Sequence, residues 1–261
     1  MNTKYFLNRI LNNKLKLSVM FVFILIPVID VFASFKTVIV DHYDLGANFF
    51  LRKGYFSFLA GSNNSLQALY EIIVWFLPLF LLLIFCDIFV EDFQTGVKNI
   101  LVSKVGLKKY YMNSIFFSLK SGFILPLVSL LPNLLMVNII FARGINNNTD
   151  ISGEPEFFQF CYSHMTLTNI IYILIFAVLA SILSGAITSI ALMTKSRRIA
   201  YPISVFIWTV PNFIRRSIVY SLQPFTEYDL LYSLSTVLGI IVLCILIIIA
   251  GYLKEVKFAK V

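Results

Sequence analysis

Six long apolar runs constrain this chain more than any other feature of its sequence. Each has about 20 residues or more, the length that an α-helix needs to cross the hydrocarbon core of a bilayer. Two prolines, Pro202 and Pro211, lie in the fifth run. We therefore expect that helix to be kinked or broken. The six predicted spans are residues 17–40, 69–90, 112–142, 169–193, 199–220 and 232–253.

The composition agrees with an all-α integral membrane protein. Hydrophobic residues make up 59% of the chain and charged residues only 13%. A soluble fold of 261 residues with this composition would leave too much apolar surface in water. The runs follow one another without a soluble domain or a long linker, so we predict a single transmembrane domain over residues 1–261.

The positive charges predict the orientation of the spans. The chain has 21 Lys and Arg residues against 13 Asp and Glu. Most of the basic residues lie before the first span, after the second, after the fourth and after the sixth. These segments share one side of the membrane, and the positive-inside rule places that side, with both termini, in the cytoplasm. The net charge of +8 thus reflects topology, and we do not expect nucleic-acid binding.

The residues before the first span are typical of an amphipathic helix. Phe6, Leu7, Ile10, Leu11 and Leu15 recur at helical spacing, with polar residues between them. We expect this helix to lie in the membrane interface. A frayed basic tail is the alternative.

Motifs for catalysis or nucleotide binding are missing. The chain has two histidines, His42 and His164, and neither belongs to an H-E-x-x-H zinc motif. It has no Cys-x-x-Cys pair and no G-x-x-x-x-G-K-[ST] phosphate loop. We therefore expect that the chain is not an enzyme and binds no cofactor itself.

Asp87 and Lys120 are among the charged residues that lie within apolar runs. Asp87 lies near the end of the second run and Lys120 lies in the third. Because an isolated charge in a membrane is costly, we predict an ion pair between them. In the fourth run, small residues lie close on one helical face and predict tight helix packing. They are Ala177, Ser181, Ser184, Gly185 and Thr188.

The segment between the second and third spans is the most specific stretch of the chain. Its apolar residues are spaced for a helix, and acids come first and lysines last, which suits the helix dipole. We predict one short amphipathic helix from Asp92 to Lys104, ended by Gly106. Such a helix is attached at both ends to spans, so a force on it moves both.

This arrangement resembles the permease subunit of an ABC-2 type (type V) ABC exporter. That family has six spans, an interfacial N-terminal helix and a coupling helix that starts Glu-x-x-x-Gly. Here Asp92 stands at the Glu position, Gly96 at the Gly and Leu101 at the following leucine. The acid is Asp, and the proline that often follows the leucine is absent. The coupling-helix residues that the resemblance implies are Asp92, Gly96, Val97, Lys98, Ile100, Leu101 and Lys104.

The resemblance implies a mechanism and partners. Two permease subunits, identical or related, surround the path, and a separate ABC ATPase subunit binds ATP and Mg and docks on the coupling helix. The substrate class would be a peptide-like or amphipathic molecule, such as a bacteriocin, exported across a bacterial plasma membrane. A non-ABC multispanning protein (a channel, a secondary carrier or an assembly factor) is the alternative function.

The family also often has short re-entrant helices between the fifth and sixth spans. The matching stretch is residues 211–229, and an ordinary amphipathic surface helix is the alternative there. The charged residues of this candidate segment are Arg215, Arg216, Glu227 and Asp229.

Overall fold

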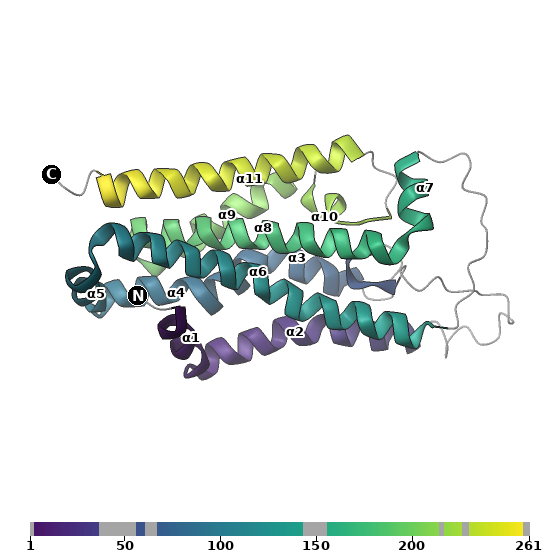
Figure 1. Ribbon diagram of the computed structural model, residues 1–261, viewed down its shortest axis with the longest axis horizontal. Coiled ribbons are helices and arrows are strands. Elements are labelled where there is room, and N and C mark those ends of the chain that lie inside the picture. The colour runs from purple at the N-terminus through teal and green to yellow at the C-terminus, as the bar shows by residue number, and fades with distance from the viewer. Residues whose placement is uncertain are drawn as a thin grey trace, which may run out of the picture.

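The fold is a bundle of long helices that lie side by side (Figure 1). The computed structural model describes residues 3–36, 56–60, 67–142, 156–213, 217–225 and 230–257, and these ranges contain helices and no strand. Within them, five helices are long and apolar enough to cross a membrane. The chain is therefore a multi-pass membrane protein, all-α over the part that the structure describes, as its apolar runs predict.

The five long helices match five of the predicted spans. The second candidate span, Ala68–Gln94, is continuous but changes its winding. It consists of α3 (Gln67–Leu81), the π-helix η5 (Leu82–Cys86) and α4 (Asp87–Gln94). The other four helices are α2 (Lys14–Phe35), α6 (Leu107–Ile140), α8 (Met165–Thr194) and α11 (Leu230–Tyr252), which continues as the π-helix η6 (Leu253–Lys257).

A sixth complete span is not confirmed. The region predicted for it begins with α9 (Arg197–Asn212), whose 16 residues extend about 24 Å at 1.5 Å per residue. That is shorter than the roughly 30 Å hydrocarbon core. Pro202 is accommodated inside α9, whereas the helix ends one residue after Pro211. A separate short helix, α10 (Ile218–Ser221), follows.

Helix α8 is the centre of the bundle and packs against α6, α11, α9 and α3. Small residues permit this packing, as their spacing predicts. A Cβ atom added at Gly122 of α6 would lie 2.7 Å from Cβ of Ser184 and 2.8 Å from the carbonyl oxygen of Ala180. Across the same contact, the hydroxyls of Ser118 and Thr188 lie 2.6 Å apart. The two backbones can approach this closely only because position 122 carries no side chain.

The two ends of the bundle differ. Helix α1 (Thr3–Leu11), helix α5 (Val97–Val105) and η6 lie at one end, and α7 (Glu156–Ser163) lies at the other (Figure 1). The helix predicted at the start of the chain is confirmed: Phe6 and Ile10 of α1 are buried, while Leu7 and Leu11 are half exposed. Phe6 packs edge-on against Phe89 and tilted against Phe117, with ring centroids 5.3 and 4.9 Å away.

Candidate functional site

The connection between the second and third spans forms the candidate site, and two glycines shape it. Gly96 has φ +74° and separates α4 from α5, while Gly106 has φ +84° and separates α5 from α6. Residues other than glycine rarely adopt these conformations. The expectation that Gly106 ends this helix is confirmed. The single helix predicted from Asp92 to Lys104 is wrong, because the chain turns at Gly96.

Gly96 therefore acts through its backbone conformation and not through a close packing contact. A Cβ atom at this position would meet no atom within 4 Å. The glycine redirects the chain, so that α5 starts in a new direction at Val97, which is half-buried.

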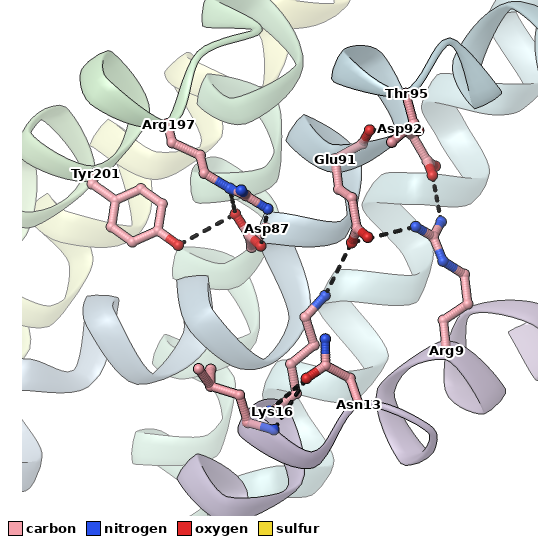
Figure 2. A network of polar contacts seen from close by, with 10 residues as sticks. Arg9, Asn13, Lys16, Asp87, Glu91, Asp92, Thr95, Arg197 and Tyr201 are labelled. Atoms are coloured by element: carbon pink, nitrogen blue, oxygen red, sulfur yellow. Dashed lines mark hydrogen bonds and ion pairs between the residues drawn. The ribbon is translucent and has the colours of Figure 1, made fainter.

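Three acids on the end of the second span pair with bases from distant parts of the chain. The first is Asp87, which accepts hydrogen bonds from Nε and Nη2 of Arg197 at 2.6 and 2.8 Å (Figure 2). The Tyr201 hydroxyl donates to the same carboxylate at 3.3 Å. The bonds to Asp87 raise the pKa of Arg197. This finding corrects the predicted Asp87–Lys120 pair, because Arg197 holds the carboxylate and Lys120 is exposed on α6.

The second and third acids, Glu91 and Asp92, hold the N-terminal helix against the bundle. Arg9 of α1 bonds to Asp92, which also accepts a hydrogen bond from the Tyr110 hydroxyl at 3.2 Å. Glu91 lies 3.4 Å from Arg9 and 3.6 Å from Nζ of Lys16 (Figure 2). Asp92 is fully buried, so its charge depends on these partners. The network joins α1, α2, α4 and α6.

A third group of charges attaches α5 to the end of the chain. Lys98 donates to Glu255 of η6 at 3.0 Å, and Lys195, which ends α8, lies 3.6 Å from the other carboxylate oxygen. Both amines also lie over the ring of Phe93, at 5.8 and 5.4 Å from its centroid. Lys98 was expected on the coupling surface, but it is buried and paired within the chain.

The remaining residues that the resemblance assigns to a coupling helix divide between the bundle and the surface. Leu101 is half-buried and packs against the apolar core. Ile100 is 57% exposed, and Lys104 is exposed on the same side of the helix. Asn99, Ile100, Ser103 and Lys104 together form what we call the exposed face of α5.

Sequence analysis missed four ion-pair partners in the candidate site, Arg9, Lys16, Arg197 and Glu255. Each lies where the pattern is charged and amphipathic, but nothing in the spacing says which acid each base meets. The paired residues are 83, 110 and 157 positions apart for Arg9–Asp92, Arg197–Asp87 and Lys98–Glu255. Only the tertiary packing brings them together.

The structure describes residues 211–213 and 217–225 of the candidate re-entrant segment. Its charged residues Arg215, Arg216, Glu227 and Asp229 lie outside the described residues. Between them, Ile218 and Leu222 are buried. The Tyr70 hydroxyl donates to the carbonyl of Val219 at 2.6 Å. This part of the segment is therefore packed into the bundle.

Among the residues that the structure describes, no group of three His, Cys, Asp or Glu could hold a metal ion.

Comparison with known proteins finds a relative of nearly the same length. The chain is 31% identical over 253 residues to YybM, an uncharacterized protein of Bacillus subtilis (strain 168), and the match covers 96% of each chain. No family model and no solved structure matches the chain.

Proposed function

The chain belongs to the same family as YybM of Bacillus subtilis, and we propose that it is the permease subunit of an ABC-2 type exporter. In this proposal a separate ATPase subunit hydrolyses ATP and docks at the end of the bundle that carries α1, α5 and η6. That end lies in the cytoplasm of a bacterial cell, by the positive-inside rule. The observation that carries the proposal is helix α5, which connects two spans directly and exposes an apolar residue.

The attachments of α5 support a coupling role. On one side α5 follows the second span after the turn at Gly96, and on the other Gly106 leads straight into α6. The Lys98–Glu255 pair attaches it to the end of α11. A push on the exposed face of α5 would therefore act on three long helices together. Coupling of this kind requires a rigid connection between the sites, and short turns and buried ion pairs supply it.

The second span also contains a turn at which its winding can change. The π-helix η5 lies in the middle of this span, immediately before Asp87. A π-helical turn inside an α-helix is often found at functional sites. We propose that motion of α4 and α5 is absorbed there, while α3 keeps its packing. The Cys86 thiol, which accepts a hydrogen bond from Thr188 at 3.2 Å, marks the end of this turn.

The substrate and the second permease subunit rest on the resemblance alone. A peptide-like or amphipathic substrate, such as a bacteriocin, is the class that the family suggests. Two permease subunits, identical or related, would enclose its path. Membrane lipid would contact the exposed apolar surfaces of helices such as α2 and α11, where Phe21 and Leu246 are both 60% exposed.

Site-specific photo-crosslinking in the native host tests the docking of an ATPase. A photo-reactive phenylalanine analogue is placed at Ile100 or Lys104, and at Glu156 of α7 as the control. The expected result is a crosslinked protein with a phosphate-binding loop at positions 100 and 104 and none at 156. The purified complex should also hydrolyse ATP. Absence of any ATPase at all three positions would contradict the proposal and favour a channel, a carrier or an assembly factor.

A further inference from the structure

A groove lies at the charged end of the bundle, beside α5 but on a different surface. It has a volume of about 760 Å³ and separates the α5–α6 corner from the end of α11 and η6. This volume is within the range of sites that hold a small molecule. The residues that line it include Leu107, Lys108, Lys109, Tyr252, Leu253, Val256 and Lys257.

The charge of the groove favours an anion. Three of its lining residues are lysines with exposed side chains, and none of the described lining residues is acidic. The acid next to Val256 is Glu255, which is buried and paired with Lys98 and Lys195. No carboxylate lining the groove therefore neutralises the lysines. The first turn of α6 adds to this field through the positive end of its dipole.

The apolar wall of the groove favours a lipid. Tyr252, Leu253 and Val256 form this wall at the end of the apolar run of α11, where the lysines begin. A boundary of this kind, with a tyrosine beside lysines, marks the surface of a membrane. Leu253 is also on the outer surface, and Ile249 lies one turn before it and is 49% exposed. The wall thus continues into the lipid-facing surface of α11, along which an acyl chain can lie.

We propose that this groove binds the headgroup of an anionic phospholipid in the leaflet at this end of the bundle. The phosphate would lie among Lys108, Lys109 and Lys257, and the first carbons of an acyl chain would lie against Tyr252 and Leu253. Basic pockets between spans are a known way for membrane proteins to bind anionic headgroups. An acidic protein segment would be attracted by the same lysines, but it would not use the lipid-facing wall. The inference does not depend on the proposed transport function.

The test compares two triple variants that lose the same charge. The groove variant is Lys108→Gln, Lys109→Gln and Lys257→Gln. The control variant is Lys14→Gln, Lys104→Gln and Lys254→Gln, which removes three exposed lysines from the same end outside the groove. The full-length proteins are titrated with phosphatidylglycerol or phosphatidylcholine, and lipid binding is followed by native mass spectrometry. Thermal unfolding in phosphatidylcholine alone establishes that both variants are folded.

We expect wild-type protein and the control variant to prefer phosphatidylglycerol, and the groove variant to bind it at least tenfold more weakly. Each lysine near an anionic surface contributes about fivefold. Equal losses in the two variants, or no loss in either, would overturn the proposal. The proposal would also be overturned if inorganic phosphate raised the unfolding temperature of wild-type protein as much as the lipid does, because that result would show a site for the free anion. If the groove variant does not fold, the single change Lys257→Glu gives the same comparison with Lys254→Glu.

An acidic protein partner predicts a different result. In that case the groove variant would keep its preference for phosphatidylglycerol but would lose a protein that co-purifies with wild type. That outcome would overturn the lipid assignment.

Discussion

The Asp87 carboxylate at the end of the second span accepts two hydrogen bonds from one guanidinium, from Nε and Nη2 of Arg197 at 2.6 and 2.8 Å. Asp87 is buried, whereas the Arg197 side chain is 46% exposed. This arrangement joins the span that leads into α5 to the first turn of α9. A two-bonded Arg–carboxylate pair fixes orientation as well as proximity, so it sets the direction in which α4 leaves the membrane.

The first prediction concerns this pair. Asp87→Asn should destabilise the protein by about 1.5–3 kcal/mol, the usual worth of a hydrogen bond to a charged group. Arg197→Gln should cost a similar amount, and the double variant should cost less than the sum of the two. Unfolding in detergent micelles measures the free energies, and a double-mutant cycle gives the coupling.

Lys120→Gln is the control for that cycle. Because Lys120 is exposed and Asp87 is held by Arg197, Lys120→Gln should show no coupling with Asp87→Asn. Strong coupling between positions 87 and 120, and none between 87 and 197, would show that the ion pair is assigned to the wrong base.

The second prediction concerns the turn before α5. Gly96→Ala should destabilise the protein by about 1–2 kcal/mol, because the Cβ atom of alanine is sterically strained at a positive φ. No neighbouring atom would clash with the new methyl group, so the loss of stability would report the strain of the backbone alone. Gly239→Ala is the matched control: Gly239 lies inside α11, also with no atom within 4 Å of a Cβ, and should be neutral or slightly stabilising. Equal effects at both positions would contradict the role of the turn.

The third prediction concerns the contact between α6 and α8. Gly122→Ala should destabilise the protein by about 1–3 kcal/mol, since its methyl group would lie 2.8 Å from the backbone carbonyl of Ala180. Gly239→Ala again serves as the control. Thermal unfolding of the purified proteins makes the measurement. An unchanged Gly122→Ala variant would mean that the two helices are farther apart than the structure places them.

Five of the six predicted spans are confirmed, because the cause of a span is local. A run of about 20 apolar residues is itself the physical requirement for crossing a bilayer, and the small residues of α8 lie on one face by helical periodicity alone. The break at Gly96 was missed because a glycine within a helical pattern is tolerated at a cost of about 1 kcal/mol. Its flanking residues look helical on both sides.

The ion pairs could not be predicted in the same way. The sequence offers several bases that could pair with Asp87, and it favours Lys120 only because both charges lie inside apolar runs. The decisive fact is the packing of α9 beside α3 and α8, which places Arg197 at the same depth as Asp87. Likewise, the sequence pattern places Lys98 at the surface, whereas the structure places Glu255, beyond the end of α11, next to it.

The fourth prediction concerns the two ends of the bundle. All three native cysteines are buried, and burial raises the pKa of the Cys161 thiol, so wild-type protein should react little with maleimide at neutral pH. In intact cells, an impermeant maleimide should label Glu156→Cys and Ser163→Cys in α7. It should not label Ser103→Cys or Lys254→Cys until the membrane is opened. The reverse pattern would overturn the cytoplasmic assignment of α5.

The last prediction concerns the exposed face of α5, where folding and docking can be separated. Ile100 is 57% exposed, so Ile100→Asp should leave the protein folded. If this residue is buried against an ATPase, losing it removes roughly 1.5–3 kcal/mol of contact, or about tenfold to over a hundredfold in affinity. Ile100→Asp should therefore abolish co-purification with the ATPase and coupled ATP hydrolysis.

Leu101→Asp provides the contrast. Leu101 packs against the core, so its substitution should lower the melting temperature of the permease itself, before any partner is added. Phe160→Asp changes another exposed apolar residue (45% exposed) at the opposite end of the bundle and should affect neither property. The opposite result would contradict this prediction. If Ile100→Asp still assembles with the ATPase, and Leu101→Asp folds normally but no longer assembles, then the ATPase docks on the side of α5 that carries Leu101.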